Sequence, residues 1–461
     1  MTLIKSISGI RGTIGGTPGQ ALTPPDIIKF SAAFACWARE QSGSNRLVIG
    51  RDARPSGEMV AQLVKGAVTA MGLDIIDLGL STTPTVEMAV PHHRAAGGII
   101  ITASHNPVEW NALKLLNDKG EFVSSQDGET ILSLADSALK YATVDKLGQI
   151  HQDNEALQRH IEAILALPEV DKEAIRKAGF TIAVDAVNSS GGIAVPALLR
   201  TLGIENIVQV NCEPNGRFAH NPEPLPENLG EISRTVVSEK CDLGIVVDPD
   251  VDRLALICED GSMFGEEYTL VAVADYLLGR QPGNTVSNLS STRALRDITE
   301  KYGGQYEAAA VGEVNVVEKM KATRAVIGGE GNGGIIFPAL HYGRDALVGI
   351  ALFLTHLARQ QTTVSALRAG YPAYFMAKKK IALTPAIEVD AILQQMAALY
   401  AHAQLNTVDG LKIDLPDGWI HLRKSNTEPI IRIYTEAASE QAANNLADKA
   451  ISQIQELATA K

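Results

Sequence analysis

Three aspartates, Asp248, Asp250 and Asp252, occupy alternate positions directly after the apolar run 243–247. Carboxylates this close repel one another unless a cation lies among them, and hard oxygen ligands favour Mg²⁺ or Mn²⁺ over zinc. A solvated acidic turn is the alternative, although such turns rarely follow a buried strand so directly. The spacing therefore predicts a divalent-metal site with room for a phosphoryl oxygen, which the adjoining Arg253 could also contact.

Ser104 is a candidate reactive serine. It lies in the segment Ile-Thr-Ala-Ser-His-Asn-Pro at residues 101–107, after the apolar run 98–102. Ligand-binding residues of α/β proteins gather at the carboxyl ends of sheet strands, so this serine is well placed for use. The neighbouring His105 could orient the serine or hydrogen-bond to it. No Gly-x-Ser-x-Gly elbow surrounds it, so a reactive serine and an ordinary polar turn both remain open.

A glycine-rich segment at residues 328–334 reads Gly-Gly-Glu-Gly-Asn-Gly-Gly. Its glycines allow close approach of the backbone, and only Glu330 and Asn332 carry side-chain chemistry. Their donors and acceptors suit sugar hydroxyls, and the segment does not match a nucleotide-binding fingerprint. A purely structural glycine turn remains the alternative.

A basic segment at residues 423–429 reads Arg-Lys-Ser-Asn-Thr-Glu-Pro and gathers guanidinium, ammonium, hydroxyl and amide donors. Such donors are what a phosphate dianion requires. The predicted phosphate-binding residues are Arg423, Ser425, Asn426, Thr427 and Arg432. The alternative is a basic surface hairpin, because lysine and arginine commonly protect exposed strand edges.

Two isolated basic residues fit the same chemistry. Arg11, in the segment 8–12, could bridge to a phosphorylated Ser104. Lys114 could act as a general acid or base if burial or neighbouring cations lower its pKa towards neutrality. Neither residue is strong evidence alone, since a lone lysine is usually a solvated charge.

The composition describes an ordinary globular protein of several domains. A chain of 461 residues is too long for one hydrophobic core. Its net charge of -12 opposes general binding to nucleic acid, and nothing suggests a membrane partner. The amino-terminal residues lack the pattern of a secretory signal, so we expect a cytoplasmic protein. We expect buried free thiols at Cys36, Cys212, Cys241 and Cys258.

The order of predicted elements indicates four domains. Up to residue 370, short apolar β-rich runs alternate with amphipathic helical stretches, which is typical of α/β domains with mixed, mostly parallel sheets. We predict three related α/β domains at 1–150, 151–253 and 254–370, and a small α+β domain at 371–461.

Together these segments resemble the α-D-phosphohexomutase superfamily, in order and over essentially the whole chain. In that family a Ser-His-Asn-Pro loop carries a phosphoserine, an Asp-x-Asp-x-Asp-Arg loop binds Mg²⁺, a Gly-Glu loop contacts the sugar and an Arg-x-Ser-Asn-Thr loop binds phosphate. The resemblance implies catalytic roles for Ser104, Lys114, Arg11 and His105, metal ligation by Ser104, Asp248, Asp250 and Asp252, and substrate binding by Arg253, Glu330, Asn332, Arg423, Ser425, Asn426, Thr427 and Arg432.

The resemblance also implies a central cleft between the four domains, a mechanism and a set of cofactors. Phosphorylated Ser104 would donate its phosphoryl group to a hexose 1- or 6-phosphate, and the resulting 1,6-bisphosphate would turn over and return its other phosphoryl group. The implied cofactors are Mg²⁺, the phosphoserine and a hexose 1,6-bisphosphate activator. The implied partner is a sugar phosphate, with a monomer or a homodimer both open.

The identity of the sugar depends on finer resemblances. Gly334 stands where many glucose and mannose mutases carry histidine, and the glycine-rich form looks more like archaeal-type phosphoglucosamine mutases. The segment 311–315 resembles the Val-Gly-Asp/Glu turn of glucosamine enzymes, and its carboxylate could favour a 2-ammonium group. We therefore expect glucosamine phosphate, with glucose and mannose phosphates as alternatives. A sugar-phosphate-binding module and a metal-dependent phosphatase are the rival classes.

Overall fold

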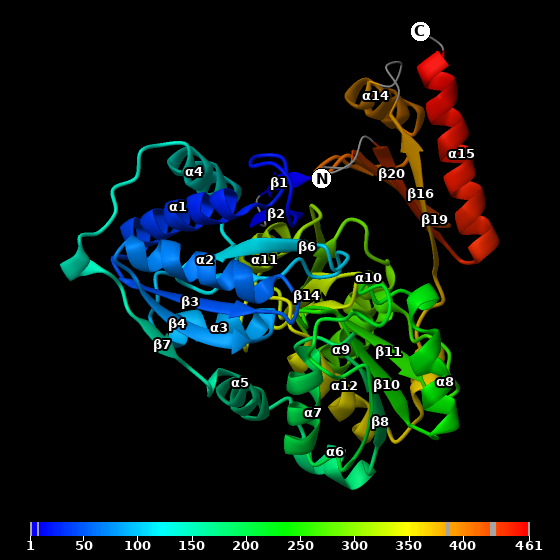
Figure 1. The fold of residues 1–461 in the computed structure, drawn as a ribbon. Helices are drawn as coiled ribbons and strands as arrows, with labels where there is room; N and C mark the ends of the chain where they lie inside the picture. Colours follow the sequence, from blue (N-terminus) through cyan, green and yellow to red (C-terminus); the bar gives the residue numbers. More distant parts are fainter. Residues whose placement is uncertain (1, 7–8, 384–387, 425–429, 460–461) are drawn as a thin grey trace. The chain divides into compact units, whose positions relative to one another are not determined.

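The computed structural model contains four sheets, each covered by helices, in the part of the chain that it describes (Figure 1). The described residues are 2–6, 9–383, 388–424 and 430–459. By the density of internal contacts the chain divides into a first unit, residues 1–277 with 332–368, and a second unit, residues 278–331 with 369–461.

The first sheet is a mixed sheet of seven strands in the order β1-β2-β6-β5-β3-β4-β7. The strands are β1 (Leu3–Ser6), β2 (Gly9–Thr13), β3 (Arg46–Arg51), β4 (Asp74–Leu80), β5 (Gly97–Ile101), β6 (Trp110–Leu116) and β7 (Ile150–Gln152). The helices are α1 (Pro24–Ser42), α2 (Gly57–Ala70), α3 (Thr83–His92) and α4 (Ser125–Ala135). β3, β4, β5 and β7 run parallel, while β6 is antiparallel to β5 and β2.

Both faces of the first sheet are buried, as the continuous apolar strands predict. Side chains alternate along a strand, so Leu47 and Ile49 join the core beneath α1 and α2, while Val48 packs beneath α3 on the opposite face (Figure 1). β3 and β5 pair in parallel. Their carboxyl ends are therefore neighbours, which brings residues 52–54 beside the loop that carries Ser104.

The second sheet has four strands in the order β11-β10-β8-β9. Its strands are β8 (Thr181–Asp185), β9 (Asn206–Val210), β10 (Leu243–Val247) and β11 (Leu254–Cys258). Its helices are α5 (Ala156–Leu165), α6 (Lys172–Ala178), α7 (Gly191–Thr201) and α8 (Gly230–Ser238). β11 is antiparallel to β10, so this sheet continues past residue 253, where the sequence places a boundary.

The third sheet has the order β13-β12-β14-β15, with β12 parallel to both neighbours β13 and β14. Its strands are β12 (Thr285–Asn288), β13 (Tyr306–Ala309), β14 (Ile327–Glu330) and β15 (Gly334–Ile336). The helices that pack on it are α10 (Ala294–Lys301) and α11 (Glu313–Thr323). The neighbouring chain segments form α9 (Glu266–Arg280), α12 (Ala346–Gln360) and α13 (Val364–Ala369), and α12 packs on α6 in the first unit. Glu330 is thus the last residue of a strand, although the sequence suggests a loop there.

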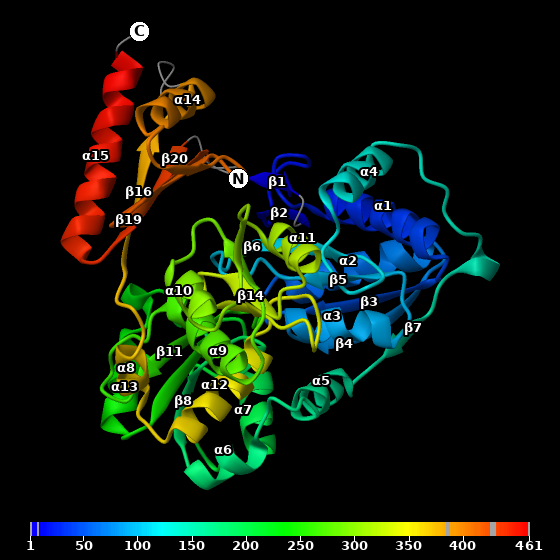
Figure 2. The ribbon, with the colours of Figure 1, turned by 180° about the vertical axis from the view of Figure 1, so that it is seen from behind.

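The fourth sheet is antiparallel, in the order β16-β20-β19-β18-β17. Its elements are β16 (Phe375–Ala382), α14 (Val389–Leu399), β17 (Gln404–Asn406), β18 (Leu411–Leu415), β19 (Gly418–Lys424), β20 (Ile430–Ala437) and α15 (Glu440–Thr459). α14 and α15 cover one face of the sheet and share a single apolar core with it (Figure 2). The small α+β architecture expected after residue 370 is therefore confirmed.

No helix within the described ranges combines the length and the apolar character that crossing a bilayer requires. All four cysteines are free thiols. Cys241 and Cys258 are buried as expected, whereas Cys36 and Cys212 are partly exposed.

Candidate active site

The loop that carries Ser104 is held in place by one buried arginine, Arg54. Its guanidinium donates to the carbonyl oxygens of Ser104, Asn106 (2.7 Å), Pro107 (2.6 Å) and Trp110 (3.1 Å). Ser104 itself has a φ of 49°, in the left-handed region that non-glycine residues rarely adopt. Strain of this kind persists where the surroundings over-determine the backbone, which is common at functional sites.

Asp52 and Thr102 complete the support of the serine. Asp52 Oδ2 accepts hydrogen bonds from Arg54 Nε (3.0 Å) and from the Thr102 hydroxyl (2.6 Å). The same hydroxyl accepts the Ser104 amide at 2.9 Å. Our sequence reasoning missed Asp52 and Arg54, although they follow a buried strand just as Ser104 does. That signal could have found them.

The three aspartates lie on the loop between β10 and β11, and all of them are fully buried. Asp248 is directly joined to the serine, because Ser104 Oγ donates to its Oδ2 at 2.6 Å. Its other oxygen accepts the amides of Asp252 and Arg253 at 3.2 Å each. Val251, at a φ of 63°, gives this loop a second strained residue, and β-branched side chains strongly disfavour that conformation.

Cationic side chains from distant segments contact this loop. Lys114 on β6 donates to Asp250 Oδ2 at 2.7 Å and to Asp252 Oδ2 at 3.3 Å. Arg344, which our sequence reasoning missed, donates to Asp252 Oδ2 at 2.7 Å. Thr83 adds a hydroxyl donor to Asp250 at 2.5 Å.

Lys114 does not have the lowered pKa that a neutral base needs. Burial alone would lower its pKa, but Asp250 and Asp252 outweigh burial and raise the pKa above the ordinary lysine value. The lowered pKa that Lys114 would need to act as a base is therefore absent in this arrangement. The residue is held as an ammonium ion, which can supply positive charge and a proton.

The donor set of this loop fits Mg²⁺. Asp250 Oδ1 and Asp252 Oδ1 are buried without a hydrogen-bond partner among the described residues. Burial, followed by the charges of Asp252 and Asp250, raises the pKa of Asp248 well above its usual value. One oxygen from each aspartate lies within 4.8 Å of the others. Unpartnered buried carboxylate oxygens are costly, and a hard divalent cation would satisfy them.

Three other predicted residues lie in the first unit near the serine and metal loops. Arg11 donates to the Asn106 side chain at 2.9 Å. His105 Nδ1 is buried and has no hydrogen-bond partner within the described residues, and burial, with Arg253 and Arg11, lowers the pKa of this ring well below its usual value. Arg253 pairs with Glu223 at 3.5 Å. The lowered pKa of His105 keeps its ring neutral.

The glycine-rich segment lies where the two units divide. In the first unit, Gly333 packs on the backbone at Leu254, and a Cβ there would meet the Leu254 carbonyl oxygen at 2.2 Å. A Cβ at Gly334 would lie 2.4 Å from Arg344 Cδ, so this glycine makes room for the arginine that contacts Asp252. Both glycines therefore allow the close approach that the sequence predicts for this segment, whether or not it binds a sugar.

The side chains of the predicted sugar segment belong to different units. Asn332, in the first unit, accepts the Gly334 amide at 3.2 Å through its side-chain oxygen. Glu330, in the second unit, accepts hydrogen bonds from Asn288 (2.9 Å) and from the Gly312 amide (3.1 Å) through Oε1. Glu330 is 5% exposed, and both of these donors lie in the second unit with it.

The predicted phosphate segment is described in part. Arg423 ends near the carboxylate of Asp409, with Nε 3.3 Å from Oδ2. Arg432 on β20 lies opposite Arg423 on β19, and it donates to the Tyr434 hydroxyl at 3.4 Å. The other three residues lie outside the described residues: Ser425, Asn426 and Thr427.

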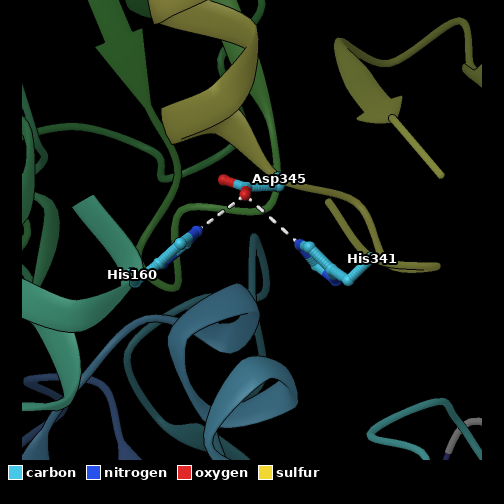
Figure 3. A group of neighbouring side chains, drawn as sticks. All are labelled: His160, His341 and Asp345. Carbon is cyan, nitrogen blue, oxygen red and sulfur yellow. Dashed lines mark hydrogen bonds and ion pairs between the residues drawn. The ribbon is translucent and has the colours of Figure 1, made fainter. Parts of the chain in front are cut away.

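A second group with the composition of a metal site consists of the buried His160 and Asp345 with the half-buried His341, and we call it the histidine cluster. Figure 3 shows both rings directing a nitrogen at the Asp345 carboxylate. The Nε2 atoms lie 2.9 and 3.2 Å from the same oxygen, Oδ2. The remaining ring nitrogens face Thr85 Oγ1 at 3.0 Å and Glu87 Oε2 at 3.4 Å. Hydrogen bonds thus engage three of the four ring nitrogens, and the fourth, His341 Nδ1, has no hydrogen-bond partner among the described residues.

Four family domains match the chain in order. Their descriptions are phosphoglucomutase/phosphomannomutase alpha/beta/alpha domains I, II and III, followed by the C-terminal domain. They cover residues 3–142, 158–261, 265–374 and 378–453.

Known proteins match over nearly the whole length. A phosphoglucomutase/phosphomannomutase of Thermococcus kodakarensis is 34% identical over 96% of this chain and 98% of its own. A phosphoglucosamine/phosphogalactosamine mutase of Sulfurisphaera tokodaii is 30% identical over 96% of each chain. A crystal structure of a phosphoglucomutase/phosphomannomutase family protein from Burkholderia thailandensis superposes with a TM-score of 0.86 at 26% identity, covering 99% of this chain and 97% of that one. The chain therefore belongs to the phosphoglucomutase/phosphomannomutase family.

Proposed function

We propose that the protein is a phosphohexomutase that moves a phosphoryl group between O1 and O6 of a hexose phosphate through Ser104. One observation carries the proposal: the Ser104 hydroxyl lies 2.6 Å from Asp248, on a loop of three buried aspartates with unpartnered oxygens. A hydroxyl nucleophile beside a metal-competent carboxylate set is suited to phosphoryl transfer. Membership of the family supports the same reaction class.

The proposed cycle begins with phosphorylated Ser104. Its O–P bond breaks as a sugar hydroxyl forms a new O–P bond, and the proton lost by that hydroxyl is balanced by the proton gained by the serine oxygen, which yields a hexose 1,6-bisphosphate and the free serine. After the intermediate turns over, its other phosphoryl group returns to Ser104. Arg54 holds the loop backbone through both transfers, so the serine oxygen does not have to be repositioned.

Charged side chains of the chain provide the remaining chemistry in this proposal. Asp248, Asp250 and Asp252 would hold Mg²⁺, which neutralises charge on the phosphoryl group during transfer. Lys114, held as an ammonium, can donate a proton to an oxygen that loses its phosphoryl group. Arg11 stands beside the serine loop through Asn106 and can pair with phosphoryl oxygens.

Within this class we propose glucosamine phosphate as the preferred substrate, with glucose and mannose phosphates as the alternative. Many glucose and mannose mutases carry histidine at the position of Gly334, which has no side chain. Arg344 fills the space beside this glycine. Glu313, at the start of α11, offers a carboxylate on the turn that the resemblance links to a 2-ammonium group. A cytoplasmic location fits the four free thiols.

The test of substrate is a coupled assay with the 1-phosphates of glucosamine, N-acetylglucosamine, glucose and mannose, each with a bisphosphate activator. The proposal expects the highest kcat/KM for glucosamine 1-phosphate. A far higher value for glucose 1-phosphate would overturn the substrate assignment while leaving the mutase class intact. No turnover of any of the four would contradict the class itself.

The test of the phosphoserine is the intact mass of the purified protein. A fraction of the molecules should be heavier by one phosphate, about 80 Da. Ser104→Ala should remove that fraction and abolish turnover. If phosphate persists in the variant, Ser104 is not the relay.

A further inference from the structure

The turn between β17 and β18 places one carboxylate, Asp409, against the strand that leads into the phosphate segment. Gly410 makes this possible: it has a φ of 73°, and a Cβ there would meet the Leu422 carbonyl oxygen at 2.2 Å. The glycine lets the turn lie flat on β19. Asp409 is thereby brought beside Arg423, the first residue of the predicted phosphate segment.

A single oxygen of Asp409 serves two partners from different elements. Oδ2 accepts the backbone amide of Val311 at 3.0 Å and forms an ion pair with Arg423 Nε at 3.3 Å. The two charged side chains are 21% and 14% exposed, so their attraction is less screened than that of a surface pair.

The backbone at Val311 and Gly312 is held from its other side as well. The Gly312 amide donates to Glu330 Oε1 at 3.1 Å, and Asn288 donates to the same oxygen at 2.9 Å. Successive amides of one turn therefore bind two different carboxylates, one from β14 and one from the β17–β18 turn. Neither carboxylate can shift without moving the turn.

The main chain of Asp409 is also fixed. His421 Nε2 donates to the Asp409 carbonyl oxygen at 2.7 Å, and its Nδ1 accepts from Ser290 at 3.0 Å. Burial lowers the pKa of His421 to about 4, so the ring stays neutral and keeps this pair of contacts at physiological pH.

We infer that Asp409 is a positioning residue that joins the sugar-reading turn at 311–312 to the phosphate-binding Arg423. The inference rests on the proposed function, because the two roles follow from the same resemblance to the phosphohexomutases. A ligand that engages Arg423 through its non-reacting phosphate then meets a sugar-reading turn already in place. The geometry makes binding of the phosphate and recognition of the sugar a single event within the second unit.

Two substitutions separate the contacts. Asp409→Asn keeps an oxygen that can accept the Val311 amide but removes the charge that faces Arg423. We expect KM for glucosamine 1-phosphate and glucose 1-phosphate to rise by the same factor, about tenfold, with kcat changed less than about twofold, because uniform binding is lost. Asp409→Ala removes both contacts and should, in addition, change the ratio of kcat/KM between the two sugars by about threefold or more.

The matched control is Asp417→Asn, which changes an exposed aspartate on the next turn of the same sheet. It should leave KM, kcat and the sugar ratio unchanged. Wild-type KM in Asp409→Asn would overturn the inference even if Asp409→Ala does not fold. A loss of kcat without a change in KM would also overturn it, because that result assigns a different role. Absence of turnover in the wild type would instead count against the proposed function.

Discussion

The first unit contains two clusters of possible metal ligands that differ in how many carboxylate oxygens they leave without a hydrogen bond. We call Asp248, Asp250 and Asp252 the aspartate cluster and compare it with the histidine cluster. In the aspartate cluster, two carboxylate oxygens have no hydrogen-bond partner among the described residues. In the histidine cluster, three of the four ring nitrogens have hydrogen-bond partners, and the fourth, His341 Nδ1, lies 3.4 Å from Glu87 Oε2 without a hydrogen bond. The second Asp345 oxygen accepts the amides of Leu347 and Val348.

The difference shows that composition and proximity do not by themselves indicate a ligand site. An unpartnered buried carboxylate costs free energy that only a ligand or a proton can recover. The aspartate cluster carries that cost and stands beside a serine hydroxyl. The histidine cluster instead joins α5, through His160, to the residues before α12, through His341 and Asp345, and we expect it to contribute to stability.

The largest expected effect comes from Asp250→Asn. It removes one predicted metal ligand and the principal partner of Lys114, so turnover should fall by roughly a thousandfold or more. Mg²⁺ binding, followed by titration calorimetry or by Mn²⁺ paramagnetic resonance, should be lost with the fold intact by circular dichroism. Undiminished turnover would remove the metal from the mechanism.

Asp345→Asn is the matched change in the histidine cluster. It keeps an oxygen for the cap of α12 but removes the charge between two rings, so the free energy of unfolding should fall by about 3 kcal/mol. Chemical denaturation measures this value. Mg²⁺ affinity should not change. A loss of affinity equal to that of Asp250→Asn would contradict the claim that only the aspartate cluster binds Mg²⁺.

His421 extends the comparison with the histidine cluster, because it is buried and, among the described residues, its ring has no carboxylate hydrogen-bond partner. Burial lowers its pKa to about 4, whereas an unfolded histidine titrates near ~6.5. As pH falls from about 6.5 to 4, His421 becomes protonated in the unfolded chain but not in the folded chain. The free energy of unfolding therefore falls over that pH range.

The expected loss from His421 is about 2 kcal/mol between pH 7.5 and pH 5. Denaturation of the wild type and of His421→Gln at both pH values isolates this contribution, because other titrations cancel in the difference. Equal pH dependence in the two proteins would show that His421 is not neutral in the fold.

The smallest expected effect is that of Gly334→Ala. Its Cβ would lie 2.4 Å from Arg344 Cδ, so the guanidinium should move away from Asp252 and weaken Mg²⁺ binding by about tenfold. The control is Gly66→Ala in α2, where a Cβ meets nothing within 4 Å and should only improve helix stability. Equal Mg²⁺ affinity in both variants would show that Arg344 does not affect metal binding.

Sequence reasoning found the residues that follow buried strands. Ser104 and the three aspartates were identified from an apolar run directly before each of them, and the parallel sheets are consistent with that logic. Arg54 and Arg344 were missed because the contacts of a long side chain depend on which strands become neighbours. The raised pKa of Lys114 cannot be predicted from the sequence for the same reason, since its carboxylate partners are more than 130 residues away.

The most direct test of the account follows the phosphoryl group itself. Phosphorylated protein is mixed with one equivalent of glucosamine 6-phosphate, and the intact mass of the protein and the small-molecule products are recorded together. If Ser104 is the relay, the protein loses one phosphate and an equal amount of 1,6-bisphosphate appears, with no signal from Ser104→Ala. Release of that phosphate as inorganic phosphate, or its retention on the protein, would contradict a relay through Ser104.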